Sequence, residues 1–437
     1  MVFRGPAVLG AHRPGLRQPQ PRRLPCLRTA SRDQLRDREH PAGPSPRPGR
    51  GRRSRLLRAD RGGRPGRGHP GMSGTVTLTY LDLTPTQRTL LDGLPFDGNH
   101  VIDGPPGSGK SVLAAQRAVM LALTGTPAVL LTRSNLLRQS LASMVSALCS
   151  GSATVTVATA HSWLARWYGP DAPRADDGWY DWPAFYERAA LAEPGGPLTL
   201  VVDEGQDLPP AFYRLCRILG ARTTVFADEC QRLTESNSTL LEIAQGLGKC
   251  SPHVLDANYR NTRQTAELGA RFHLGPHPPA LPVRDGPVPR LHSLSHQGAV
   301  ADLLIGLAER RPGRSIGVVV HSTQAQFELL TRLERKAPRL RPQMYTAQAT
   351  AGRYRTLDLS RPGIVIVHRA SAKGLQFDTV VVPDTESDAG TDSTSAELRM
   401  AYYVMSTRAR HDLHFVYAGE REPGHLKEIP RHVLARS

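Results

Sequence analysis

The stretch that decides the fold is HVIDGPPGSGKS at residues 100–111. A short apolar strand (His100–Asp103) leads into a glycine-rich loop, and a helical pattern follows as far as about Leu123. The loop fits the pattern GxxxxGK[ST], in which backbone N–H groups and a helix N-terminus surround phosphate oxygens. A glycine-rich turn before an ordinary helix is the alternative, and the order of strand, loop and helix argues against it. The predicted ATP-binding residues here are Gly104, Pro105, Pro106, Gly107, Ser108, Gly109, Lys110 and Ser111.

Within this loop, two side chains have distinct predicted roles. Lys110 reaches the β and γ phosphates, and Ser111 binds Mg²⁺.

A pair of acidic residues, Asp203 and Glu204, follows a run of five apolar or β-branched residues at 198–202. Such a run is typical of a buried parallel strand. Carboxylates at the end of such a strand face the same crevice, so we expect Asp203 to hold Mg²⁺ and Glu204 to polarise the attacking water. Acidic residues also end strands as simple turn formers, but two adjacent acids downstream of this loop make that alternative weaker.

The second half of the chain repeats the alternation of strand and helix patterns. Strands are predicted near Arg290–Leu294 and 316–320, and helices near Ala299–Arg310 and Thr323–Lys336. This rhythm is typical of a parallel sheet covered by helices. The sequence therefore predicts an α/β protein with a first domain at residues 72–250 and a second at 251–437.

Further motifs give the chain a family resemblance. Residues 84–87 (TPTQ), 128–141 (AVLLTRSNLLRQSL), 159–164 (TAHSWL), 203–207 (DEGQD) and 225–233 (VFADECQRL) come in order in the first domain. Residues 255–261 (LDANYRN), 372–378 (AKGLQFD) and 402–409 (YYVMSTRA) follow in the second. Together these motifs resemble those of UvrD/Rep-type superfamily 1 helicases, which implies two RecA-like P-loop domains that hydrolyse ATP with Mg²⁺ and move along single-stranded nucleic acid, DNA rather than RNA.

The resemblance also implies roles for individual residues. Catalysis would involve Lys110, Glu204, Gln231, Arg260 and Arg408. Nucleotide contacts would add Gln87, Tyr259, Gly374 and Gln376. The single strand would be contacted by Thr132, Ser134, His161 and Trp163. Residues 84–87 also form a helix capping box, and the two roles of Gln87 are compatible.

The chain departs from the family pattern in ways that keep a second hypothesis open. Only about a hundred residues separate Arg260 from Ile364, where the family carries a large insertion, and Gln231 is not followed by the usual base-stacking aromatics. Gln376 stands where the family has glutamate. The alternative to a motor is an ATP-gated switch that controls a partner protein or nuclease without unwinding a duplex.

All four tryptophans lie at residues 163–182, at the position of a predicted small insertion of about 165–196. They could stack on single-stranded bases or form the core of the insertion, and the core is the more common use of aromatic rings.

The net charge of +17 is concentrated at the N-terminus. Residues 1–71 hold eighteen arginines, no lysine and four acids, and they are rich in proline and glycine. We expect this tail to be disordered. It could bind nucleic acid, or it could be upstream sequence before a native start at Met72, which we favour.

The five cysteines form no CxxC pair, and the longest apolar runs fall far short of the ~20 residues of a membrane helix. These patterns predict a cytoplasmic protein without a structural zinc site or disulfide framework.

Overall fold

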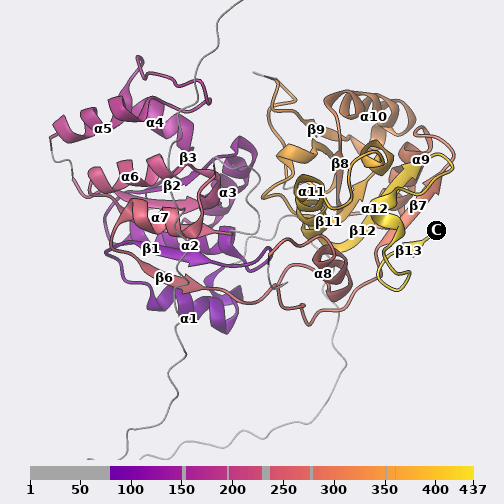
Figure 1. Cartoon of the computed structure of the whole chain (residues 1–437), viewed down its shortest axis with the longest axis horizontal. Helices are drawn as coiled ribbons and strands as arrows, with labels where there is room; N and C mark the ends of the chain where they lie inside the picture. The colour runs from indigo at the N-terminus through magenta and orange to yellow at the C-terminus, as the bar shows by residue number, and fades with distance from the viewer. Residues whose placement is uncertain are drawn as a thin grey trace, which may run out of the picture. The chain divides into compact units, whose positions relative to one another are not determined.

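Two parallel β-sheets organise the part of the chain that the structure describes (Figure 1). The computed structural model describes residues 79–149, 154–193, 196–228, 237–275, 279–349, 352–359 and 361–437. By their contacts, these residues all belong to one unit, Gly68–Ser437. The predicted tail at 1–71 lies outside the described residues.

The first sheet has the strand order β3-β2-β4-β5-β1-β6, and every described pairing in it is parallel. Its strands are β1 (His100–Asp103), β2 (Ala128–Thr132), β3 (Val155–Thr159), β4 (Thr199–Asp203), β5 (Arg222–Ala227) and β6 (Ser251–Val254). The central strand β4 is buried along its whole length, as expected for a strand covered on both faces. Parallel pairing brings the carboxyl ends of β1, β4 and β5 to one edge of the sheet.

Helices cover both faces of this sheet (Figure 1). Leu91, Leu113 and Leu141 of α1 (Pro85–Gly93), α2 (Lys110–Leu123) and α3 (Asn135–Leu148) pack on one face. The opposite face is covered by α4 (Ala160–Tyr168), α5 (Trp182–Leu191), α6 (Pro210–Ile218) and α7 (Leu240–Leu247). Alternate strand residues serve the two cores: Val201 belongs to the first, and its neighbour Val202 to the second.

The second sheet has the order β13-β7-β12-β11-β8-β10-β9. Its strands are β7 (Arg290–Leu294), β8 (Ser315–Val320), β9 (Gln343–Tyr345), β10 (Gly363–His368), β11 (Phe377–Val382), β12 (Ala409–Ala418) and β13 (Ala435–Arg436). Its helices are α8 (Arg263–Ala270), α9 (Ala299–Arg310), α10 (Thr323–Lys336), α11 (Ala396–Thr407) and α12 (Gly424–Lys427). Leu136 of α3 joins the core of this second domain, so an apolar contact links the two domains.

The predicted fold class, α/β with two RecA-like domains, is confirmed. The sequence places the boundary between the domains at residue 250, but β6 (Ser251–Val254) pairs with β1 and therefore belongs to the first sheet. The physical reason is that the edge position of β6 comes from pairing with a strand about 150 residues earlier, which local patterns do not reveal.

No helix among the described residues is long and apolar enough to cross a membrane.

The aromatic segment between α4 and α5 forms a core rather than an open stacking platform. Trp179 is only 2% exposed, and Tyr180 and Phe185 are fully buried. Trp163 packs edge-on against Phe212, with ring centroids 6.2 Å apart. The structure therefore favours the second of the two interpretations of these rings.

Candidate nucleotide site and adjoining cavity

The phosphate-binding loop has the geometry that its glycines allow. Gly107 and Gly109 adopt φ of 86° and 90°, a backbone region that residues with a Cβ rarely enter. At Gly107 a Cβ would also lie 2.1 Å from Oδ1 of Asn258 in the second domain. The N-cap of α2 is Gly109, which has no side chain to bond the first N–H groups of the helix, and such N–H groups can bind an anion.

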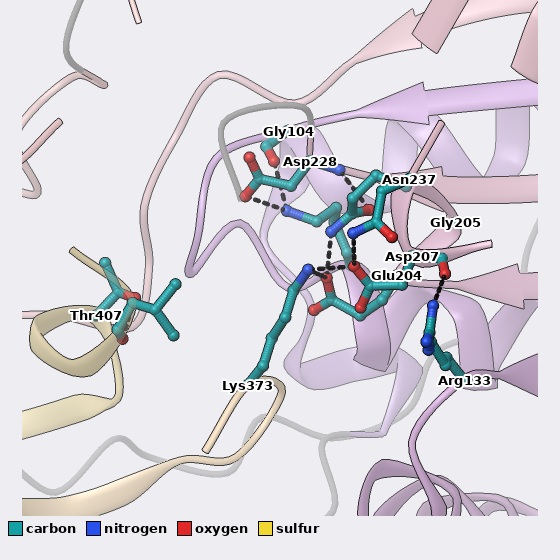
Figure 2. A network of polar contacts seen from close by, with 12 residues as sticks. Gly104, Arg133, Glu204, Gly205, Asp207, Asp228, Asn237, Lys373 and Thr407 are labelled. Carbon is teal, nitrogen blue, oxygen red and sulfur yellow. Dashed lines mark hydrogen bonds and ion pairs between the residues drawn. The ribbon is translucent and has the colours of Figure 1, made fainter. Parts of the chain in front are cut away.

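Lys110 folds back onto its own loop in this structure. Its Nζ donates to the backbone oxygen of Gly104 and, at 3.0 Å, to that of Pro105. It also pairs with Oδ2 of Asp228, 3.2 Å away at the end of β5 (Figure 2). The ammonium thus lies at the phosphate loop with an acidic partner that the sequence patterns did not single out.

Gln87 contacts the loop as well as capping its own helix. Its Oε1 accepts a hydrogen bond from the backbone N–H of Thr84 at 3.0 Å, which completes the expected capping box. Its Nε2 donates to the backbone oxygen of Ser108 at 2.8 Å. Gln87 therefore holds the loop in position, and its contact with adenine stays a prediction.

Asp203, at the end of β4, has the surroundings expected of a metal ligand. Neither carboxylate oxygen makes a hydrogen bond of normal geometry to the described residues, although both are buried. Burial and the neighbouring charge of Glu204 raise the pKa of Asp203 to about 7, against the smaller effects of Ser111 and Lys110. A buried carboxylate beside a hydroxyl is a suitable partial donor set for Mg²⁺. Among the described residues no group of three His, Cys, Asp or Glu could hold a metal by itself, so phosphate and water oxygens would complete the shell.

Glu204 has an unusual backbone for a residue with a side chain. Its φ of 55° and ψ of 48° lie in the left-handed region, and such strain collects at functional sites. Oε2 accepts a hydrogen bond from Nε2 of Gln206 at 2.6 Å and lies 3.9 Å from Nζ of Lys373 (Figure 2). Burial alone would raise the pKa of Glu204, but the charges of Lys373, Lys110 and Arg408 outweigh it and lower the pKa.

A cavity of about 430 Å³ adjoins the loop and receives residues from both domains. Tyr259 donates its backbone N–H to the oxygen of Gly107 at 2.9 Å, while its side chain stays 41% exposed. The predicted nucleotide-binding residues that line this cavity are Gln87, Gly107, Gly109, Tyr259, Arg260 and Gln376. Gly374 does not line it; with φ of 78°, it faces the side chain of Leu137 in α3.

Hydrogen bonds link the two arginine-bearing segments of the second domain. Asn261 donates through Nδ2 to the backbone oxygens of Thr407 and Ala409, at 3.2 and 2.6 Å. Arg408 lies between these two residues and is 1% exposed. The position of Arg260, next to Asn261, is therefore fixed relative to Arg408.

Both guanidinium groups belong to the same electrostatic environment. Burial and the positive charges of Arg408 and Arg410 lower the pKa of Arg260 to about 9, while Glu204 and Asp203 act in the opposite direction. Burial also lowers the pKa of Arg408, against the charge of Glu204. The charge of Glu204 thus acts on both arginines, and a bound triphosphate would offset their mutual repulsion.

A second cavity, of about 570 Å³, lies beside this site, and we call it the strand cavity. Two of the predicted strand contacts, Ser134 and His161, line it, and the ring of His161 stacks on Trp179 at 4.1 Å between centroids. The other two, Thr132 and Trp163, are buried and do not line it. The rest of the lining consists of residues to which the sequence patterns assigned no strand contact: Arg133, Asn135, Thr159, Asp207, Asn237, Tyr345, Ala347, Arg355, Ala370, Ser371 and Lys373.

Gln231 falls at residues 229–236, outside the described residues, so its predicted role between the γ-phosphate and the strand stays a prediction. Lys373 had a sequence signal, since it directly precedes Gly374 in the AKGLQFD element. Asp228 also lay inside a quoted motif, and its pairing with Lys110 could not be read from spacing.

Comparison with known proteins found no matching family model and no match among curated proteins. Among solved structures, the C-terminal domain of a possible DNA helicase from Lactobacillus plantarum WCFS1 shares 22% identity over 41% of this chain and 99% of that one, with a TM-score of 0.30. Arterivirus nonstructural protein 10, a helicase, shares 14% identity over 76% of this chain and 62% of that one, with a TM-score of 0.37. Dbp5 of S. cerevisiae, bound to RNA and ADP BeF3, shares 13% identity over 80% of this chain and 87% of that one, with a TM-score of 0.46. The chain is thus similar to helicases at low identity, and these matches assign it no substrate.

Proposed function

We propose that this chain is an ATPase of the UvrD/Rep-like kind that moves along single-stranded nucleic acid. The observation that carries the proposal is a cavity in which the phosphate loop of one domain meets Tyr259 and Arg260 of the other. The charges of Asp203 and Glu204 act on Arg260, and that of Glu204 also acts on Arg408. Such an arrangement makes hydrolysis depend on closure between the domains, because transition-state charge on the γ-phosphoryl group needs cations from both sides.

The proposed roles follow from position. Lys110 leaves its loop carbonyls for the phosphates, and Glu204 orients and polarises the attacking water. Arg260 and Arg408 stabilise the charge that develops on the transferred group. Ser111 and Asp203 would hold Mg²⁺, which supplies charge neutralisation at the phosphates when it is bound.

The strand cavity supports nucleic acid as the second ligand. It carries three cationic side chains, Arg133, Arg355 and Lys373, contributed by both domains, together with hydroxyl and amide groups. Arginine, lysine, hydroxyl and amide side chains are the groups that contact phosphodiester oxygens. Because the cations come from both domains, a bound strand would respond to changes in their separation.

The test is the turnover of ATP with and without a single-stranded oligonucleotide. We expect DNA to raise the turnover several-fold, and RNA of the same sequence to raise it less. Removal of one phosphate contact in Arg355→Ala should weaken DNA binding and make the slope of log K against log salt shallower by about 0.7. Arg339, an exposed arginine paired with Glu309, offers the matched control Arg339→Ala.

A flat response to both DNA and RNA would contradict the motor and favour the nucleotide-gated switch. Equal binding of DNA by wild type and Arg355→Ala would place the strand elsewhere on the protein.

A further inference from the structure

A continuous polar network joins the phosphate loop to the strand cavity (Figure 2). It starts with the pair between Lys110 and Asp228 at 3.2 Å. The backbone N–H of Asp228 donates to Oε1 of Gln206 at 3.0 Å, and Nε2 of the same amide donates to Glu204 at 2.6 Å. Gln206 is fully buried, so one amide fixes the positions of the two acidic residues relative to each other.

The far end of this network is Lys373, contributed by the second domain. Its Nζ lies 2.5 Å from Oδ1 of Asp207 and 3.9 Å from Oε2 of Glu204. The ammonium is therefore shared between a carboxylate of the strand cavity and the proposed catalytic carboxylate. Both Asp207 and Lys373 line the strand cavity, while Glu204 does not.

The position of Asp207 is held from several sides. Asn237 donates to its Oδ1 at 3.5 Å, and Arg133 donates to its backbone oxygen at 3.1 Å. Arg133 also lines the strand cavity. A phosphate in this cavity would thus lie among Arg133, Asp207 and Lys373, where it would repel the carboxylate and attract both cations.

Exchange of one anion for another is the simplest consequence of this arrangement. The side chains of Lys373 and Asp207 are 9% and 15% exposed, and an ion pair so largely removed from water is costly to break unless each charge finds a new partner. A strand phosphate offers Lys373 such a partner at the same place, while Asp207 keeps Asn237. The exchange would draw the ammonium away from Glu204, and that carboxylate would then be available to a water molecule.

We propose that the Asp207–Lys373 pair is a latch that restrains ATP hydrolysis until a strand phosphate replaces Asp207 as the partner of Lys373. This inference rests on the proposed function, since it assumes that Glu204 acts on the attacking water. It makes Lys373 and Asp207 positioning residues that act through Glu204.

The test is the ratio of ATP turnover with saturating single-stranded DNA to turnover without it. In Asp207→Asn the side chain keeps its shape and loses its charge. ATP turnover without DNA should therefore rise about fivefold or more, and the ratio of turnover with DNA to turnover without it should fall by a similar factor. Lys373→Gln removes the latch from the other side and should also raise strand-free turnover, which keeps the test valid if one variant folds poorly. The control is Asp302→Asn, which removes an exposed ion pair between Asp302 of α9 and Lys336 of α10, 2.8 Å apart. This variant should leave the rates with and without DNA unchanged.

Equal ratios in wild type, Asp207→Asn and Lys373→Gln would overturn the latch, as would a parallel loss of both rates in the two variants. These outcomes are distinct from failure of the proposed function, in which wild type itself shows no response to a strand. Arg355→Ala separates strand affinity from the latch: it should raise the DNA concentration needed for half-maximal stimulation and retain the stimulation at saturation.

Discussion

Arg408→Ala lowers the maximal rate of ATP hydrolysis by roughly 10³–10⁵-fold, the range expected for an arginine that stabilises phosphoryl-transfer charge. Arg408 is 1% exposed and follows α11 directly, with its Nε donating to the backbone oxygen of Val404 at 3.0 Å. Its position is also fixed through Asn261, which bonds to the residues on either side of it. The guanidinium is therefore preorganised, and its loss removes charge stabilisation with little change in nucleotide affinity.

Single-turnover hydrolysis and equilibrium binding of a nonhydrolysable ATP analogue measure the two effects separately. Arg408→Lys should recover only part of the rate, because an ammonium lacks the planar fork of donors. Arg339→Ala is the matched control, since that side chain is 64% exposed and surface ion pairs contribute little. A variant without Arg408 that hydrolyses ATP as fast as wild type would remove this residue from the active site.

Glu204→Gln should reduce the maximal rate by about 10²–10⁴-fold, as expected for the loss of a general base. Glutamine keeps the size of the side chain and an oxygen that can accept from Gln206, so the loop geometry is expected to persist. Without the carboxylate, the attacking water loses its general base, whereas the binding of ATP does not depend on the charge of residue 204.

Measurement of the rate over a range of ATP concentrations should show a fall in kcat with little change in KM. Thermal unfolding of the variant checks that the left-handed backbone at residue 204 tolerates the change. Glu309→Gln, on the surface of the second domain, is the matched control. An unchanged kcat would mean that another group activates the water, and a raised KM alone would assign Glu204 to binding.

Much of the fold could be predicted because its signals are local. The strand at 100–103, the helix that ends near Leu123 and the two helices at 299–310 and 323–336 all appear as predicted. Each has an apolar pattern, a cap or a glycine that acts within a few residues. The carboxylates at the end of β4 were predictable for the same reason, since a buried parallel strand must end at the edge where the loop lies.

The contacts that organise the site are not local, and the sequence did not reveal them. Lys110 pairs with Asp228 across 118 residues, and Lys373 reaches Asp207 across 166. The motifs contained these residues, but spacing along the chain does not say which side chains meet when two domains pack. Trp163 is a different case. Its motif suggested a contact with the single strand, while its ring is largely buried in the core. The sequence of the motif does not indicate whether an aromatic ring is buried or exposed.

The most direct measurement of the central claim is the release of inorganic phosphate from Mg·ATP by purified protein, with Lys110→Ala beside the unaltered chain. The account predicts steady release by the unaltered chain, stimulated by single-stranded DNA, and release at the background level by the variant with DNA present or absent. Equal release by the two proteins would contradict the claim that this loop and its lysine hold the triphosphate.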